Sequence, residues 1–241
     1  MALVTVPLDF RGRTLPFTFP NSGNMGDHLR NILAGKDYPL PPLPPDFRIE
    51  TVVDIGANVG AAALWFLGAA PEARVVCFEP ARQNHDCLVH NLKQFPNAEA
   101  HPWGLFSTDR ELTLHLGASQ CMQHSIYSSR ETGAATETVA LKDAAAQFDA
   151  LGLDRVTILK VDTEGCEVPI LERLGDRLNA VAILYLEWHS DDDRRRIDAL
   201  LAPRFLLAHA VATFPHRGNA CYLAREVAAR VPAIDQMRIG D

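Results

Sequence analysis

Most of the chain alternates short apolar runs with segments of helical periodicity. Continuous apolar runs cover residues 51–55, 74–78, 156–161 and 180–186, as expected for strands that are buried on both faces of a parallel sheet. Helical patterns follow the first two runs, the second of them over residues 83–95. Repeated strand–helix units of this kind predict an α/β fold with a mainly parallel, doubly wound sheet.

Weaker patterns predict the remaining strands and one helix start. A third strand is expected over residues 99–105, and the alternation over 111–116 favours an antiparallel strand. Residues 205–213 and 220–225 are expected to close the sheet as an antiparallel edge pair. Ser190 precedes three consecutive aspartates. This order predicts a helix capped by the serine, because acids in a first turn complement the helix dipole.

The N-terminal part of the chain carries a different pattern. Residues 4–19 alternate on both sides of Gly12, which predicts a hairpin, and a short helix is expected over 26–33. Residues 38–45 are rich in proline, which fixes φ and removes backbone donors, so we expect an extended connector. The predicted organisation is an N-terminal extension with a Pro-rich connector over 1–46, a main domain over 47–226 and a C-terminal tail over 227–241.

Composition and charge narrow the class of protein. The 241 residues are 47% hydrophobic and 22% charged, which is typical of one globular domain with a short extension. The 30 acidic and 23 basic residues give a net charge of −7, so nucleic acid is not an expected substrate. No secretory signal and no long apolar span are recognisable. We therefore expect a cytoplasmic protein without membrane insertion.

The most informative stretch is residues 53–60, VDIGANVG, which follows the first predicted strand and opens a helix. Glycines at this place allow a sharp turn and a close approach of a ligand to the main chain. The spacing G-x-N-x-G lacks the G-x-G-x-x-G of dinucleotide sites, and the chain has no G-x-x-x-x-G-K-[ST] for nucleoside triphosphates. The loop therefore favours a ligand other than NAD or ATP.

Two acidic residues accompany this loop. Asp54 precedes the first glycine and suits a ligand with a cationic methionine part better than one with a pyrophosphate. Glu79 follows the second predicted strand, where an acid can accept both hydrogen bonds of a ribose diol. Together they predict an adenosyl ligand that lies across the carboxyl edge of the sheet.

Three segments carry a resemblance to a known family. They are VVDIGANVG at 52–60, FEPARQNHDCLVHNL at 78–92 and ILKVDTEGCEVPILERL at 158–174, and GKDYPLP at 35–41 is a weaker match. In these segments the chain resembles the FkbM family of methyltransferases. The resemblance implies a Rossmann-like class I methyltransferase fold with S-adenosylmethionine as methyl donor. It also implies O-methylation of a hydroxyl on a small molecule, sugar or glycolipid.

The resemblance further implies which residues contact the methyl donor. Carried onto this chain, the family pattern assigns this role to Asp54, Gly56, Asn58 and Glu79, in agreement with the reasoning from the residues. Many methyltransferases hold the adenine with an acid after the third strand, where this chain has Trp103 and its neighbours. We expect apolar packing there instead, from Trp103 or Leu105. The full predicted set is Asp54, Gly56, Ala57, Asn58, Gly60, Glu79, Pro80 and Trp103.

The methyl acceptor is expected at the ends of the fourth and fifth strands. Methyl transfer needs an acceptor oxygen near the methyl group and a base that removes its proton. His189 can act at neutral pH, whereas Asp162 or Glu187 would need a raised pKa or a metal. We rank His189 and Asp162 first, with His124 as a further candidate. Asp162, Glu187 and His189 also form a candidate ligand set for Mg²⁺.

Two alternatives stay open from the sequence. One is a protein that binds S-adenosylmethionine without catalysis and regulates or scaffolds a partner. The other, an NAD-dependent oxidoreductase, is disfavoured by the glycine spacing. The residues identify neither the oligomeric state nor the acceptor, whether small molecule or glycan. We expect the acceptor pocket to use the N-terminal extension and a loop over 117–138.

Overall fold

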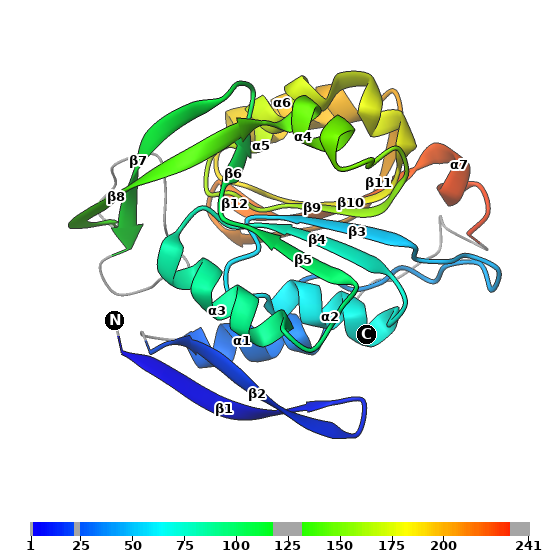
Figure 1. The fold of residues 1–241 in the computed structure, drawn as a ribbon. Helices are drawn as coiled ribbons and strands as arrows, with labels where there is room; N and C mark the ends of the chain where they lie inside the picture. Colours follow the sequence, from blue (N-terminus) through cyan, green and yellow to red (C-terminus); the bar gives the residue numbers. More distant parts are fainter. Residues whose placement is uncertain (1, 22–24, 118–131, 232–241) are drawn as a thin grey trace.

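A seven-stranded sheet forms the centre of the computed structural model, which describes residues 2–21, 25–117 and 132–231 (Figure 1). The strand order is β11-β12-β10-β9-β3-β4-β5. Neighbours from β10 to β5 run parallel, while β12 is antiparallel to both β10 and β11. The predicted mainly parallel sheet with an antiparallel edge pair is therefore confirmed. The strands are β3 (Thr51–Ile55), β4 (Arg74–Phe78), β5 (Ala98–His101), β9 (Val156–Val161), β10 (Val181–Trp188), β11 (Phe205–Phe214) and β12 (Arg217–Ala224).

Helices cover both faces of this sheet, as a doubly wound fold requires. Helices α1, α2 and α3 lie on one face, and α4, α5 and α6 lie on the other (Figure 1). Alternate residues of the central strands pack into the two layers: Val52 and Val75 into the first, Val53 and Val76 into the second. The helices are α1 (Met25–Leu33), α2 (Ala61–Ala69), α3 (Arg82–Leu92), α4 (Ala144–Ala150), α5 (Glu167–Leu174), α6 (Asp191–Leu201) and α7 (Arg225–Ala228), with a 3₁₀ helix at Gly175–Ala180.

The start of helix α6 forms as the sequence predicted. Ser190 caps α6 as predicted, because its hydroxyl oxygen accepts a hydrogen bond from the backbone N–H of Asp193 at 3.0 Å. After β12 the chain stays against the domain, and Val227 and Val231 are buried. Within the described residues, no helix combines the length and the apolar character needed to cross a bilayer.

The N-terminal hairpin and helix form as predicted and pack on the main domain. Asn91 of α3 ties the hairpin down, because its side chain accepts a hydrogen bond from the N–H of Thr18 and donates one to the carbonyl of Thr18, both at 2.8 Å. Phe17 and Tyr38 are buried in the same hydrophobic core as the first helical layer. The extension is thus part of the wall of the domain. Its strands are β1 (Leu3–Phe10) and β2 (Arg13–Pro20).

The prediction of a third strand over residues 99–105 is wrong in extent. The structure places β5 in the large sheet and β6 in a separate sheet of order β6-β8-β7. Pro102 lies at the break and has no N–H with which to continue the ladder of β5. The loop expected over 117–138 is wrong from residue 132 onward, where β8 pairs with both β6 and β7; residues 118–131 lie outside the described part. The small sheet consists of β6 (Gly104–Phe106), β7 (Arg110–Gly117) and β8 (Thr132–Asp143).

Candidate active site

A cavity of about 420 Å³ lies at the carboxyl edge of the large sheet, where open α/β sheets bind their ligands. Its described lining includes residues of α1, of the small sheet and of the chain after β3, β4 and β9, together with Tyr38 of the connector, Glu187 of β10 and Arg217 of β12. We call the part lined by residues 56–58 and Glu79 the glycine-loop end. We call the part lined by Asp162 and Glu187 the carboxyl end, after the side-chain carboxyl groups of these two residues. The two ends belong to the same cavity.

Tight backbone packing shapes the glycine-loop end. Gly56 has a φ of 80°, and a side chain at this position would overlap the carbonyl oxygen of Asp162. The N–H groups of Gly56 and Ala57 both donate to the carbonyl of Phe78 at 3.0 Å. Gly60, with a φ of 89°, then begins α2. The N-terminus of α2 therefore faces the cavity, and its positive dipole end favours a carboxylate there.

Glu79 binds the backbone of this loop from the end of β4. Its Oε2 accepts a hydrogen bond from the N–H of Asn58 at 2.8 Å, and its Oε1 accepts one from the N–H of Ala81 at 2.9 Å. Burial raises the pKa of Glu79 to about 7, although both backbone hydrogen bonds favour the ionised form. Each oxygen can accept a second hydrogen bond. Glu79 lines the cavity, so the predicted contact with a diol is sterically open.

Asp54, predicted to contact the cofactor, is not part of the described cavity lining. Its side chain is fully buried behind the cavity, with Oδ1 2.9 Å from Nζ of Lys160. Nζ of Lys160 also donates to the carbonyl of Gly56 at 2.9 Å. Burial alone would lower the pKa of Lys160, but the carboxylates of Asp54 and Asp162 raise it, so the ammonium group stays charged. Asp54 thus holds the glycine loop through Lys160, and a direct cofactor contact is not what this geometry favours.

The sequence analysis missed Lys160, although a signal was present. A lysine in the middle of the apolar run 156–161 must be buried with a partner, because an unpaired buried charge is costly. Asp54 on the neighbouring strand β3 is its register partner, since the two residues pair directly in the sheet. The pairing could therefore have been inferred once β3 and β9 were taken as neighbours.

The other predicted cofactor residues divide into two groups. Gly56, Ala57, Asn58, Glu79 and Pro80 belong to the described cavity lining, whereas Gly60 and Trp103 do not. The Trp103 ring packs on the His101 ring, with centroids 4.8 Å apart. Leu105 lines the cavity in its place. Of the two residues expected at the adenine, the structure thus favours Leu105.

Two acidic side chains meet at the carboxyl end. Asp162 follows β9, and its Oδ2 accepts a hydrogen bond from the Tyr38 hydroxyl at 3.0 Å and lies 3.6 Å from Nζ of Lys160. Glu187 of β10 also lines this end, and the two carboxyl groups shift each other's pKa. Burial and the neighbouring Asp162 raise the pKa of Glu187 to about 9. Burial would also raise the pKa of Asp162, but Lys160 and His189 hold it low. At neutral pH the pair therefore holds one proton, on Glu187.

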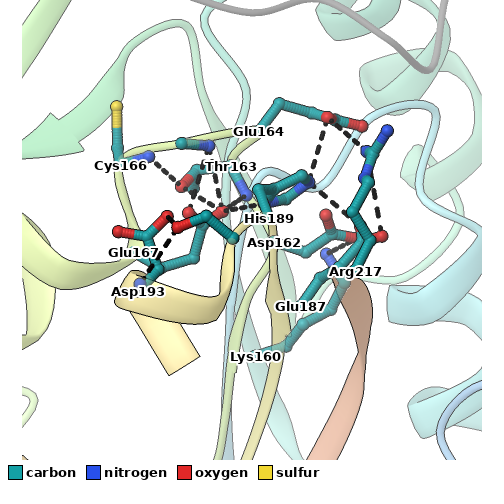
Figure 2. Close-up of polar contacts among 12 residues, drawn as sticks. Lys160, Asp162, Thr163, Glu164, Cys166, Glu167, Glu187, His189, Asp193 and Arg217 are labelled. Carbon is teal, nitrogen blue, oxygen red and sulfur yellow. Dashed lines mark hydrogen bonds and ion pairs between the residues drawn. The ribbon is translucent and has the colours of Figure 1, made fainter. Parts of the chain in front are cut away.

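His189 lies among three carboxylates rather than on the cavity wall (Figure 2). Its Nε2 is 3.0 Å from Glu164 and 3.6 Å from Glu187, and its Nδ1 is 3.6 Å from Glu167. Burial lowers its pKa, but the close carboxylates of Glu164 and Glu167 outweigh burial and raise the pKa to about 11. A ring with this pKa carries its proton at neutral pH, so this geometry does not favour His189 as the neutral base expected from the sequence.

The cluster of candidate metal ligands in the structure has Glu164 where the sequence predicted Asp162. Two cationic side chains already contact its carboxylates. Among the described residues, ligand atoms of Glu164, Glu187 and His189 lie within 4.8 Å of one another. Arg217 of β12 lies 3.0 Å from Glu164 and 4.0 Å from Glu187 (Figure 2). These carboxylates thus already face a guanidinium and an imidazolium, and a divalent cation would have to displace both. As arranged, the cluster does not fit a resident Mg²⁺, which also prefers oxygen ligands. His124, the further base candidate, lies outside the described residues.

Fold and site together define a class of protein. A mainly parallel sheet with a glycine loop after β3, an acid at the end of β4 and a cavity at the carboxyl edge is the class I methyltransferase fold. The family model described as "Methyltransferase FkbM domain" matches residues 54–219. The chain belongs to the FkbM methyltransferase family, as its three segments predicted, and the matched span includes both ends of the cavity.

Several curated proteins are similar to this chain. Methyltransferase 1 of Beauveria bassiana (strain ARSEF 2860) is 28% identical over 167 residues, which are 61% of this chain and 66% of that protein. Methyltransferase sdnD of Sordaria araneosa is 28% identical over 205 residues, or 71% of this chain and 78% of that protein. AMB antimetabolite synthetase AmbE of Pseudomonas aeruginosa is 28% identical over 198 residues, which are 66% of this chain and 9% of AmbE.

Solved structures support the fold. The chain is similar to methyltransferase FkbM from Methylobacillus flagellatus KT, with a TM-score of 0.55 at 17% identity over 78% of this chain and 46% of that one. It is also similar to the Methanococcus jannaschii fibrillarin pre-rRNA processing protein, with a TM-score of 0.52 at 12% identity over 91% of this chain and 82% of that one. At these identities the likeness concerns the fold alone.

Proposed function

We propose that this protein is an S-adenosylmethionine-dependent O-methyltransferase that acts on a hydroxyl group of a small-molecule, sugar or glycolipid acceptor. One observation carries the proposal. A single cavity joins a glycine loop and a diol-binding acid to a pair of carboxyl groups that can take up a proton. A methyl donor bound at the glycine-loop end would therefore face a base at the carboxyl end.

The glycine-loop end supplies the groups that an adenosyl donor needs. Glu79 accepts hydrogen bonds from the ribose hydroxyls, and the N-terminus of α2 faces the methionine carboxylate. The adenine would lie against apolar side chains, since Pro80, Leu105 and Leu141 line this part of the cavity. Leu141 of β8 lies so close to Gly104 that a side chain at that glycine would overlap it. The small sheet thus takes the place of an adenine-binding acid.

The carboxyl end supplies the base. S-adenosylmethionine, when bound, provides the methyl group on a sulfonium. In the transfer, the O–H bond and the sulfur–carbon bond break and an oxygen–carbon bond forms. The sulfur keeps the electron pair, and the Asp162–Glu187 pair takes the proton. Protonated His189 contributes positive charge beside these carboxylates and is not the base in this proposal.

Donor binding is the first test. Calorimetry with S-adenosylhomocysteine should show one site per chain, and Glu79→Gln should weaken it on the order of 10- to 100-fold. The reason is that an amide NH₂ would face one of the two backbone N–H groups that Glu79 now accepts. Glu99→Gln is the matched control, because Glu99 lies on the next strand in an exposed pair with Arg74. Absence of binding to the parent protein would count against the proposal.

Transfer is the second test, and it separates an enzyme from a binding protein that regulates or scaffolds a partner. The full chain is incubated with methyl-labelled S-adenosylmethionine and a hydroxyl-rich metabolite extract, and the labelled products are treated with alkali. Methyl ethers survive alkali, whereas methyl esters are hydrolysed. Label in an alkali-stable product supports O-methylation of a hydroxyl. Tight donor binding without labelled product across extracts would favour the non-catalytic alternative.

A further inference from the structure

Tyr38 comes from the proline-rich connector, yet it lies in the wall of the cavity. The side chain is 5% exposed and belongs to the main core. Its hydroxyl donates a hydrogen bond to Oδ2 of Asp162 at 3.0 Å, across 124 positions of sequence. The connector therefore delivers a polar group to the carboxyl end of the cavity, which a spacer between two bodies would not do.

The backbone carbonyls of this tyrosine and of the next residue are both held by hydrogen bonds. The indole N–H of Trp65, on α2, donates to the carbonyl of Tyr38 at 2.9 Å. The hydroxyl of Tyr185, on β10, donates to the carbonyl of Pro39 at 2.8 Å. The Tyr38 ring also packs against the rings of Phe66 and Tyr185, with centroids 6.2 and 5.7 Å away. The hydroxyl thus has a defined position before any ligand binds.

Two donors hold Asp162 from one side. Tyr38 and Lys160 both approach its Oδ2, at 3.0 and 3.6 Å. The Lys160 ammonium group also lies 5.6 Å from the centroid of the Tyr38 ring, so the two donors are packed on each other. With Oδ2 engaged in this way, the orientation of the carboxylate is set before an acceptor binds.

We propose that Tyr38 is a positioning residue of this active site: it acts through Asp162 and fixes the carboxylate that receives the acceptor proton. The inference rests on the proposed function, since it assigns a role within the same reaction. It also gives the proline-rich connector a role, which is to hold Tyr38 in place between α2 and β10.

The chain offers a matched control for testing this role. Tyr222 of β12 is also buried, and its hydroxyl also donates to an aspartate, Asp198, at 2.6 Å. Tyr222 is not part of the described cavity lining. Tyr38→Phe and Tyr222→Phe each remove one partly buried tyrosine-to-aspartate hydrogen bond and keep the ring. A difference between the two variants therefore reports on the site and not on the loss of a buried hydroxyl.

The test combines binding, rate and a double-mutant cycle in the full chain. S-adenosylhomocysteine affinity should stay within about twofold in both variants, because neither hydroxyl contacts the glycine-loop end. The turnover of the labelled-methyl assay should fall about tenfold or more in Tyr38→Phe and stay near the parent value in Tyr222→Phe, as expected for loss of a hydrogen bond to a charged group. Tyr38→Phe should add nothing further in an Asp162→Asn background.

Specific outcomes would overturn the inference. Equal turnover in Tyr38→Phe and the parent would do so, as would a full additional loss of turnover in the Asp162→Asn background. A crystal structure of Tyr38→Phe with S-adenosylhomocysteine gives a direct check: the inference requires a rotated or split Asp162 carboxylate, and an unmoved one contradicts it. Loss of S-adenosylhomocysteine binding in the parent would instead refute the proposed function, so the two failures are distinguishable.

Discussion

The two ends of the cavity differ in how far apart their residues lie in the sequence. At the glycine-loop end, the hydrogen bond from Asn58 to Glu79 spans 21 positions, within one strand–helix–strand unit. At the carboxyl end, Tyr38 reaches Asp162 across 124 positions, and Arg217 reaches Glu164 across 53. The first end is a local motif. The second exists only after the whole sheet has assembled.

Because of this difference, the chemistry of the glycine-loop end can be recognised from a short stretch of sequence, whereas that of the carboxyl end cannot. The glycine-loop end works through backbone geometry, which depends on residue type and spacing. The carboxyl end works through charges, and the protonation state of each group depends on neighbours from other elements. His189 shows this best, because Glu164 and Glu167 from the chain after β9 keep its proton in place.

The largest expected effect tests the residue that links the two ends. Lys160→Met removes the ammonium group that pairs with Asp54 at 2.9 Å and with Asp162 at 3.6 Å. Because the Asp54 side chain is fully buried, the lone carboxylate should lower the free energy of unfolding by about 3–5 kcal/mol. Urea unfolding at pH 7 measures this loss in the free energy of unfolding. Lys142→Met, in an exposed pair with Asp109, should cost less than about 1 kcal/mol, and equal losses in the two variants would contradict the buried pairing.

A somewhat smaller effect is expected at the point where the two ends touch. Gly56→Ala would place a methyl group against the carbonyl oxygen of Asp162 in a left-handed backbone conformation, which should cost about 2–4 kcal/mol and weaken S-adenosylhomocysteine binding. Gly152→Ala is the matched control: its φ is also positive, at 61°, but nothing lies within 4 Å of the added carbon. It should cost about 1–2 kcal/mol. Similar thermal shifts for both would mean that the loop does not press on Asp162.

The same contrast explains how much the sequence could predict. The sheet followed from apolar runs, and the glycine loop and Glu79 followed from spacing, because these signals are local. Asp54 was predicted to contact the cofactor, and its pairing with Lys160 was not foreseen, since that contact requires knowing that β3 and β9 are neighbours. Strand β8 was missed because its alternation of alanine and threonine is only weakly apolar. Nothing local marks Arg217 as part of the site, and Tyr38 is marked only by the weaker family match at 35–41.

The pH dependence of methyl transfer distinguishes the Asp162–Glu187 pair from a neutral His189 as the base. Burial and Asp162 raise the pKa of Glu187 to about 9, so this group is protonated at pH 7 and ionises as the pH rises. Loss of the Glu187 proton puts a second negative charge beside Asp162 and makes Asp162 a stronger base for the acceptor proton, so the rate should increase from pH 7 toward pH 9 by up to about tenfold per unit, and Glu187→Gln should flatten the increase. Because the pKa of Glu187 is raised in the folded protein, its contribution to stability is fully present below the ordinary carboxyl pKa and is lost progressively as the pH rises from there to about 9. A rise in the rate of the parent protein with a midpoint near pH 6.5 would instead point to a neutral His189 as the base.

The smallest expected effect concerns metal. Arg217 and protonated His189 already supply positive charge to Glu164 and Glu187, at 3.0 to 4.0 Å. A divalent cation would have to remove the His189 proton against a pKa of about 11 and displace the Arg217 guanidinium. Exhaustive chelation should therefore leave both S-adenosylhomocysteine affinity and the rate of labelled-methyl transfer within about twofold of their starting values. A rate that collapses on chelation and returns with Mg²⁺ would show that the carboxyl end exchanges its protein cations for a metal when the acceptor binds.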